Sequence, residues 1–152
     1  MDHLDLQIID FLQKDGRMPL AQIAKELNVS TGTVRLHYQK LVEKGILQIA
    51  AIPNPMLIGQ SKMAIIGIKA DGARLREIAN EVSAFAEVIY LILVTGRHDL
   101  IAEVVCSDKD HLLDFLTNKL YKVEGIRDSE TFMFLEIIKE EYTYNLNPNG
   151  KQ

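Results

Sequence analysis

The hydrophobic pattern of the chain changes its period at Pro53-Asn54-Pro55, and this change constrains the fold more than any other feature. Before these prolines, apolar residues recur every three or four positions, as on amphipathic helices. After Lys62 they form short continuous runs, which are typical of buried strands. Neither proline can donate a ladder hydrogen bond, so a strand cannot continue through this segment. The predicted organisation is a helical domain over 1–52, a linker over 53–61, a second domain over 62–145 and a disordered tail over 146–152.

Three helices are predicted in the first domain. The third begins at the N-cap Ser30, whose hydroxyl can accept a backbone N–H, and ends at Gly45, where a left-handed residue is needed. A short helix, a tight turn and a second helix form the spacing of a helix-turn-helix. The predicted limits are Leu4–Asp15, Leu20–Leu27 behind Pro19, and Ser30–Lys44, followed by a short wing or linker strand over Ile46–Ile52.

The third helix carries a polar face opposite the inward residues Val34, Tyr38, Leu41 and Val42. The net charge of the chain is −4, but basic residues outnumber acidic ones between Gly16 and Gly45, which suits a phosphate-facing surface. Arginine pairs with guanine, glutamine with adenine, and apolar groups touch thymine methyls, whereas phosphate contacts only set position. The predicted contacts with double-stranded DNA are Ser30, Thr31, Gly32, Thr33, Arg35, Leu36, His37, Gln39 and Lys40, with Ser30, His37 and Lys40 on phosphates. The alternatives are a solvated helix face or a winged helix that binds protein.

The second domain has the order β-α-β-β-α-β, which predicts a ferredoxin-like α+β fold. Its predicted strands are Met63–Ala70, Glu87–Val94, Leu100–Cys106 and Thr131–Lys139, with helices after Asp71-Gly72 and from the cap Ser107. Two helices can cover only one face of a four-stranded antiparallel sheet. The strands are nevertheless apolar on both faces, and such a surface is rarely left in water. The sequence therefore predicts a homodimer formed through the bare sheet face.

A polar loop, Thr95–Asp99, joins the two most apolar strands. In its structural interpretation it is a hairpin in which Gly96 allows a positive φ. In its functional interpretation it forms an effector pocket between subunits. Backbone groups near Gly96, together with Asp99, would bind an α-amino group, and Arg97 or His98 would bind a carboxylate.

Several function classes lack their motifs. The single cysteine, Cys106, excludes a disulfide framework within the chain and lies in an apolar run, which favours a packed strand residue. The histidines and carboxylates match no zinc signature, and no nucleophile elbow, phosphate-binding loop or dinucleotide-binding glycine run is present. We therefore expect neither a metal nor a cofactor. No signal peptide is present and the longest apolar run is too short to span a bilayer, so we expect no membrane association and a cytoplasmic protein.

The chain resembles the leucine-responsive/asparagine regulator (Lrp/AsnC) family of transcription factors over nearly its whole length. The resemblance rests on Leu4-Asp5, Ile8-Ile9, Asp15-Gly16-Arg17, Ile23-Ala24, Val29-Ser30, Thr33-Val34, Gly45-Ile46, Asn54-Pro55, Gly59, Thr95-Gly96 and Asp99-Leu100 in this order. It implies a DNA-binding regulator that dimerises, assembles further to forms such as an octamer, and responds to an amino acid or related metabolite. The effector residues implied are Gly96, Arg97, His98, Asp99, Leu100, Ser129 and Thr131.

Two positions depart from the family pattern. Arginine is common where this chain has His37, and an aromatic residue usually precedes the aspartate of the ligand loop, where this chain has His98. Two other classes are open. Sirohaem decarboxylases share both domains but are marked by additional aromatic residues including tryptophan, which this chain lacks. Stand-alone ligand-sensing partners of other regulators usually lack a first domain. We expect a regulator and no enzyme.

Overall fold

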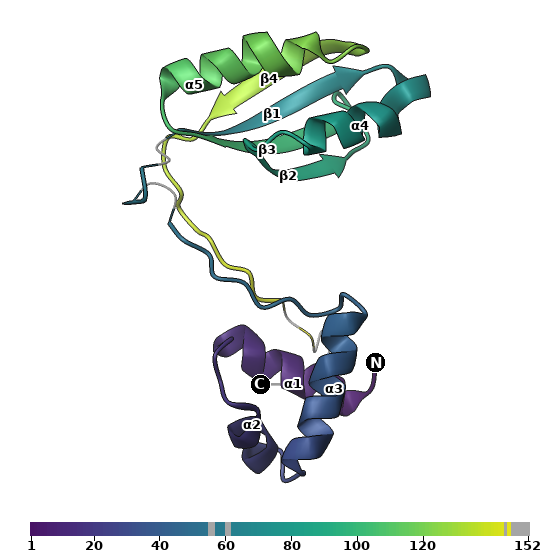
Figure 1. Ribbon diagram of the computed structural model, residues 1–152, viewed down its shortest axis with the longest axis vertical. Coiled ribbons are helices and arrows are strands. Elements are labelled where there is room, and N and C mark those ends of the chain that lie inside the picture. The colour runs from purple at the N-terminus through teal and green to yellow at the C-terminus, as the bar shows by residue number, and fades with distance from the viewer. Residues whose placement is uncertain (55–56, 60–61, 145, 147–152) are drawn as a thin grey trace. The chain divides into compact units, whose positions relative to one another are not determined.

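The computed structural model describes residues 1–144 and 146, apart from 55–56 and 60–61. The contacts divide the chain into two units (Figure 1). One comprises Met1–Ile52 with Lys139–Gln152, and the other comprises Pro53–Ile138. The segment 139–144 thus groups with the first unit, although its sequence was assigned to the second domain. Of the tail expected to be disordered, only Leu146 is among the described residues; parts of the predicted linker, 55–56 and 60–61, also lie outside them.

The first unit is built from α1 (His3–Lys14), α2 (Leu20–Glu26) and α3 (Thr31–Glu43). Each predicted helix is present, within about two residues of its expected limits. The Ser30 hydroxyl accepts the Thr33 N–H at 3.0 Å, as an N-cap does, and Gly45 adopts a φ of +65° just beyond the helix. The three helices bury one apolar cluster of Ile8, Ile9, Leu12, Ile23, Ala24, Val34 and Leu41.

Two expectations for this unit are wrong. Ile46–Ile52 forms no strand, and Ile46, Ile49 and Ile52 are largely exposed. A strand requires a hydrogen-bonded neighbour, and none pairs with this segment among the described residues. Val42, expected inside, is also exposed, because Leu41 already occupies the buried stripe beside it on α3.

The second unit contains one antiparallel sheet with the strand order β2-β3-β1-β4. Its strands are β1 (Lys62–Ala70), β2 (Val88–Leu93), β3 (Leu100–Cys106) and β4 (Ile126–Met133). In the register, Ile66 of β1 lies opposite Ala102 of β3 and Thr131 of β4. Most of the apolar run Val88–Val94 forms β2 at one edge of the sheet, and Phe132 and Met133 end β4 at the other edge.

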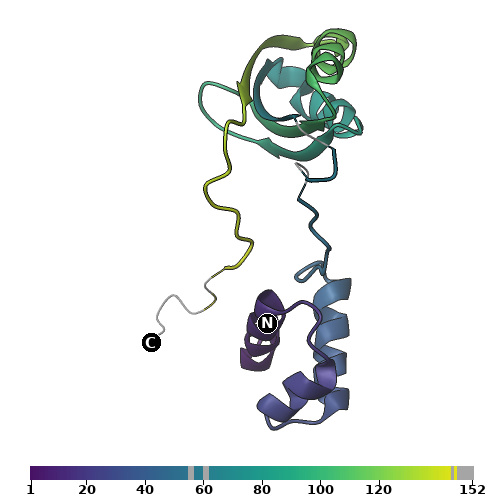
Figure 2. The same cartoon turned by 90° about the vertical axis from the view of Figure 1, so that its left-hand side faces the viewer.

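The helical segments of this unit cover one face of the sheet (Figure 2). They are η2 (Gly72–Arg74), α4 (Leu75–Ser83), α5 (Lys109–Asp114), the π-helical turn η3 (Phe115–Lys119) and η4 (Leu120–Lys122). Ile78 and Val82 of α4 and Phe115 of η3 are fully buried against Ile66 and Val104. Cys106 belongs to this core, as expected for a packed strand residue, and burial raises the pKa of its thiol. No helix of the described residues packs on the opposite face of the sheet.

The last strand and the last helix differ from prediction. The strand spans Ile126–Met133, whereas Thr131–Lys139 was predicted from the apolar run that starts at Phe132. β4 is an edge strand, and edge strands tolerate polar residues such as Arg127 and Asp128, so apolar content is a poor guide there. α5 is capped by Asp108, which accepts the His111 N–H at 2.8 Å, and not by Ser107.

In the described part of the chain, no helix combines the length and the apolar character that crossing a membrane requires.

Candidate DNA-binding and ligand-binding sites

The α3 helix presents most of the predicted DNA contacts on one exposed face. Arg35, Leu36, Gln39 and Lys40 are all exposed, and Leu36 exposes 65% of its surface although it is apolar. Val34 and Leu41, on the other side, are buried in the helical core. The exposed side chains therefore project from a helix whose orientation is fixed by packing.

Residues at the start of α3 are engaged in capping. Ser30 and Thr33 share a hydroxyl–hydroxyl hydrogen bond of 2.8 Å, in addition to the bond from the Thr33 amide to Ser30. Thr31 and Gly32 are exposed beside them. Backbone N–H groups of the first turn of a helix form a favourable site for a phosphate. The start of α3 is therefore both capped and accessible.

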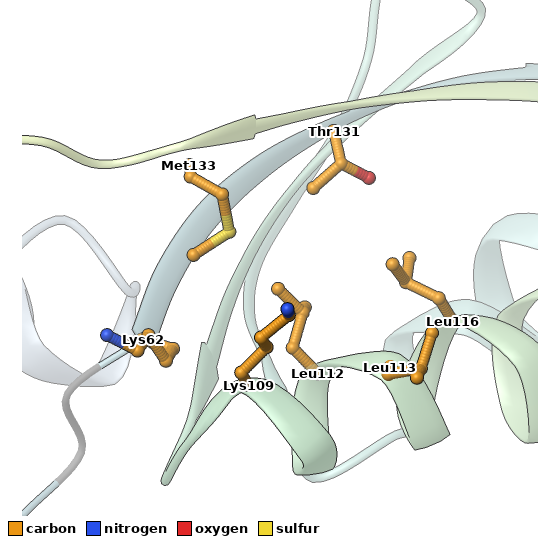
Figure 3. Close-up of a pocket in the computed structure, with 7 residues that line it drawn as sticks. All are labelled: Lys62, Lys109, Leu112, Leu113, Leu116, Thr131 and Met133. Atoms are coloured by element: carbon orange, nitrogen blue, oxygen red, sulfur yellow. The ribbon is translucent and has the colours of Figure 1, made fainter.

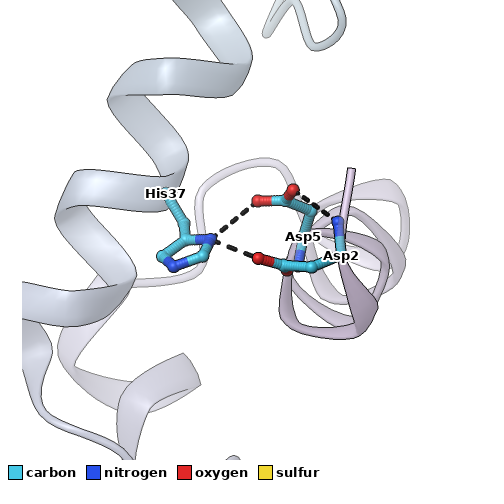
Figure 4. A group of neighbouring side chains, drawn as sticks. All are labelled: Asp2, Asp5 and His37. Atoms are coloured by element: carbon cyan, nitrogen blue, oxygen red, sulfur yellow. Dashed lines mark hydrogen bonds and ion pairs between the residues drawn. The ribbon is translucent and has the colours of Figure 1, made fainter.

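His37 is held by the first helix and is not a free surface side chain (Figure 4). Its Nδ1 lies 2.7 Å from Oδ1 of the buried Asp5 and 3.9 Å from Oδ1 of Asp2. Asp2 and Asp5 also form a capping box at the start of α1, each accepting the backbone N–H of the other. His37 was expected on the phosphate-facing list; the structure gives one of its two nitrogens a bond within the domain.

The Asp5 carboxylate is stable as an anion in this position. Burial alone raises the pKa of Asp5, but hydrogen bonds from His37 and from the Asp2 amide outweigh it, so this pKa lies below its usual value. The sequence signal for the Asp2–Asp5 capping box was the Asp-x-x-Asp spacing. No sequence spacing indicates that His37 on α3 is the partner of Asp5.

The Thr95–Asp99 loop is tied to β1. The Asp99 carboxylate accepts the Ala70 N–H at 2.9 Å with one oxygen and faces the Lys69 ammonium at 3.1 Å with the other. The Ala70 bond, followed by the Lys69 bond, holds the pKa of Asp99 below its usual range. Gly96 has a φ of +127°, which confirms the predicted need for glycine in this hairpin.

His98 lies against the backbone of Gly67 on the open face of the sheet. A Cβ at position 67 would be 2.5 Å from His98 Cδ2, so only glycine leaves room for the imidazole. His98 Nε2 lies 3.3 Å from Glu130 Oε2, and Arg97 Nη2 lies 3.6 Å from the same oxygen. The loop thus presents a carboxylate and two basic side chains at one end of this face.

Three of the expected effector residues are placed differently. The side chain of Leu100 is fully buried in the core and cannot contact a ligand. Ser129 and Thr131 lie within β4 and not in a turn before it. Because Gly67 lies opposite Glu130, the flanking residues Ser129 and Thr131 point to the helical side, away from His98. Within one chain, therefore, the seven residues do not form a single pocket.

The open face of the sheet has an apolar part, although Glu103 of β3 lies opposite Ile65 and Glu130 of β4 lies opposite Gly67 on the same face. Ile65 lies opposite Phe132, and Ile92 lies opposite Ile101, so these four side chains share this face. Phe132 exposes 49% of its surface and Ile92 37%. Tyr90, on β2, is also exposed.

An ion-paired cluster that sequence reasoning missed lies where β2 begins. The buried Glu87 accepts from Lys119 Nζ at 2.6 Å and lies 3.0 Å from His111 Nε2, both through Oε1. Burial raises the pKa of Glu87, but these two hydrogen bonds lower it to about 2. The cluster ties the start of β2 to α5 and η3.

Family models match both units. Residues 1–48 match a winged helix-turn-helix DNA-binding model, and residues 63–144 match the Lrp/AsnC ligand binding domain. Together they define a helix-turn-helix transcriptional regulator with a ligand-binding domain. The chain belongs to the Lrp/AsnC family. Members of this family are regulators and not enzymes, so the enzyme alternative is set aside.

Individual relatives match almost the full length. An uncharacterised HTH-type transcriptional regulator of Pyrococcus furiosus is 36% identical over 93% of this chain and 97% of its own. The regulator LrpA of Pyrococcus abyssi is 34% identical over 91% and 99%. Among solved structures, AsnC of Escherichia coli superposes with a TM-score of 0.82 at 26% identity, covering 94% of this chain and 97% of that one. A transcriptional regulator of Neisseria meningitidis, solved in complex with L-Met, gives 0.85 at 25% identity and 97% coverage of both.

Proposed function

We propose that α3 is the recognition helix and that it enters the DNA major groove with Arg35, Leu36 and Gln39 facing base edges. The observation that carries this proposal is the exposed face of a helix that is capped by Ser30 and fixed by Val34 and Leu41. An exposed Leu36 is costly in water but suits a thymine methyl. Lys40, Thr31 and Thr33 are assigned to phosphates and sugars, which set position. The regulator acts in the cytoplasm.

The test is selection of bound sites from a random pool of DNA, followed by titration of variants. Arg35→Ala should cost about 1–3 kcal/mol on the selected site and relax the preference at one base pair. Lys40→Ala should weaken binding to all sequences alike and reduce the salt slope by about one. Lys122→Ala, an exposed lysine of the second unit, is the matched control. Unchanged affinity of Arg35→Ala for the selected site would exclude α3 as the reader.

The second unit is proposed to form a homodimer through the open sheet face, and dimers to assemble further into forms such as an octamer. Ile65, Ile92, Ile101 and Phe132 supply the apolar centre of this interface. A two-fold dimer places two α3 helices for the two halves of a palindromic site, about 34–36 Å apart.

The ligand is proposed to be an amino acid or a related metabolite, as in the relative solved with L-Met. It would contact the Gly96–Asp99 loop, with Thr131 and Ser129 supplied from another part of the assembly. Asp99 already holds Lys69 at 3.1 Å, so an incoming ammonium would replace an existing cation there.

Asp99→Asn tests this site more sharply than alanine does, because asparagine can still accept the Ala70 N–H. The twenty amino acids are screened by thermal shift and calorimetry, and each hit is titrated against operator binding. A coupling of about 1–3 kcal/mol would change operator affinity about 5–150-fold. Asp99→Asn should abolish this response and leave ligand-free DNA binding intact. A hit whose affinity is the same in Asp99→Asn would move the ligand elsewhere.

A further inference from the structure

A cavity of about 480 Å³ lies between β4 and the helical segment that begins with α5 (Figure 3). It is lined by Lys62, Lys109, Leu112, Leu113, Leu116, Thr131 and Met133. Figure 3 shows the three leucines below the cavity and Thr131 and Met133 above it. This volume is within the range of about 300–1,000 Å³ that small-molecule sites occupy. Its lining is mostly aliphatic, with few polar groups.

The cavity is separate from the Gly96–Asp99 loop within one chain. Lys62 and Met133 stand at the end of the sheet where β1 begins, whereas Asp99 bonds to Lys69 and Ala70 at the other end of β1. At about 3.3 Å per residue, the two ends of β1, Lys62 and Ala70, are roughly 26 Å apart. The cavity also lies on the helical side of the sheet, and His98 lies on the open side.

Two polar groups at the cavity have no partner within the described part of the chain. The Lys109 ammonium forms no ion pair with any described residue, and Figure 3 shows its side chain reaching from the start of α5 toward the cavity. The Thr131 hydroxyl forms no hydrogen bond with any described residue, although the residue is half-buried. No acidic residue is among the described residues that line the cavity. A cation above an aliphatic surface favours an anion with an apolar body.

We propose that this cavity binds a small aliphatic monocarboxylate. The carboxylate would pair with the Lys109 ammonium and accept a hydrogen bond from the Thr131 hydroxyl, while the hydrocarbon part would contact Leu112, Leu113 and Met133. The lining has a cation and no acidic group among its described residues, so a ligand ammonium would find no ion-pair partner there and a simple acid is favoured over a zwitterion or an amine. This site goes beyond the amino-acid response proposed for the loop, although it shares Thr131 with the residues proposed there.

The experiment uses the full-length protein and two probes of nearly equal shape, 4-methylpentanoate and the neutral 4-methylpentanamide. Binding is measured by calorimetry and by chemical-shift changes of labelled leucine and methionine methyls. The carboxylate should bind about tenfold or more tightly than the amide, since hydrogen bonds between charged groups are the strong ones. The methyl signals of Leu113 and Met133 should shift, and those of the first unit should not.

Variants make the assignment specific. Lys109→Met keeps the aliphatic stem but removes the ammonium. The carboxylate should then bind this variant about as weakly as the amide does. Thr131→Val removes only the hydroxyl and should weaken carboxylate binding several-fold. Lys122→Met, an exposed lysine outside the cavity, should change nothing.

Three outcomes would overturn the proposal: no carboxylate binding at millimolar concentration, an equal preference for both probes in the wild type, or full carboxylate preference in Lys109→Met. A change of assembly state in Lys109→Met without carboxylate binding would instead assign the cavity to a contact between copies. Operator binding and the response lost in Asp99→Asn are measured in parallel. If the carboxylate does not bind, operator binding still tests the proposed regulator function. If the regulator function fails, the loss of operator binding shows it independently of the carboxylate measurements.

Discussion

At the scale of single residues, buried carboxylates connect segments that are far apart in the sequence. Asp5 joins α1 to His37 on α3, and Glu87 joins the start of β2 to His111 and Lys119. From the sequence, Asp5 was recognised only as part of the resemblance to the family, and Glu87 only as the first residue of a predicted strand. A local pattern indicates a cap but not a distant partner, so these pairs could not be predicted from the sequence.

The Glu87 cluster makes the stability of the second unit depend on pH. The folded-state pKa of Glu87, about 2, is below its ordinary value of 4.5. A depressed carboxyl pKa contributes stability above the unfolded-state value, and this contribution is lost as the pH falls from about 4.5 toward 2. It amounts to at most about 3 kcal/mol.

Glu87→Gln should therefore lose stability at pH 7 and flatten the decline of the unfolding free energy between pH 4.5 and 2.5. Urea unfolding followed by circular dichroism at a series of pH values gives both quantities. Glu81→Gln, at an exposed position on α4, is the control and should follow the wild-type curve. An equally steep decline in Glu87→Gln would assign the acid sensitivity to other carboxylates.

At the scale of elements, the helices of the first unit could be predicted closely and β4 could not. The Ser30 cap and Gly45 mark the ends of α3 by local backbone chemistry, which is written in the neighbouring residues. β4 takes its position from pairing with β1, in which Ala70 lies opposite Ile126, and its polar residues gave no strand signal. For the same reason, the last strand was predicted to begin at Thr131, five residues after its actual start at Ile126. The exposed face of α3 could be predicted, whereas the cavity at Lys109 needed the tertiary structure.

The cap of α3 offers a test at this scale. Ser30→Ala removes the acceptor for the Thr33 N–H and should lower the free energy of unfolding of the first unit by about 1 kcal/mol. Ser30→Asn retains a capping oxygen and should recover most of this loss. Urea unfolding of the full-length protein measures both variants. Equal free energies of unfolding for the alanine variant and the wild type would show that the cap does not stabilise the first unit.

At the scale of the whole molecule, the two units have different tasks. The first unit carries its polar face on α3, and the second leaves one face of its sheet without a helical cover. An apolar face of this kind is a feature of surfaces that meet other proteins. DNA affinity of the chain should therefore depend on a surface that does not touch DNA.

Ile92→Asp places a charge on the open sheet face at the edge strand β2 and should convert the dimer to a monomer at low micromolar concentration. Operator binding should fall with it, because a single α3 contacts only half a site. Light scattering and DNA titration test the two effects, and circular dichroism checks that the fold is kept. Tyr121→Asp, at an exposed position on the helical side, should remain dimeric. A dimeric Ile92→Asp would place the interface elsewhere.

The close approach of His98 to Gly67 has a consequence for how this chain can diverge. Because a methyl group at position 67 would overlap the imidazole, the two positions cannot change independently. An alanine at 67 requires the imidazole of His98 to move or a smaller residue to replace it. In an alignment of many descendants, these two columns should therefore covary, with loss of glycine at 67 accompanied by a change at 98.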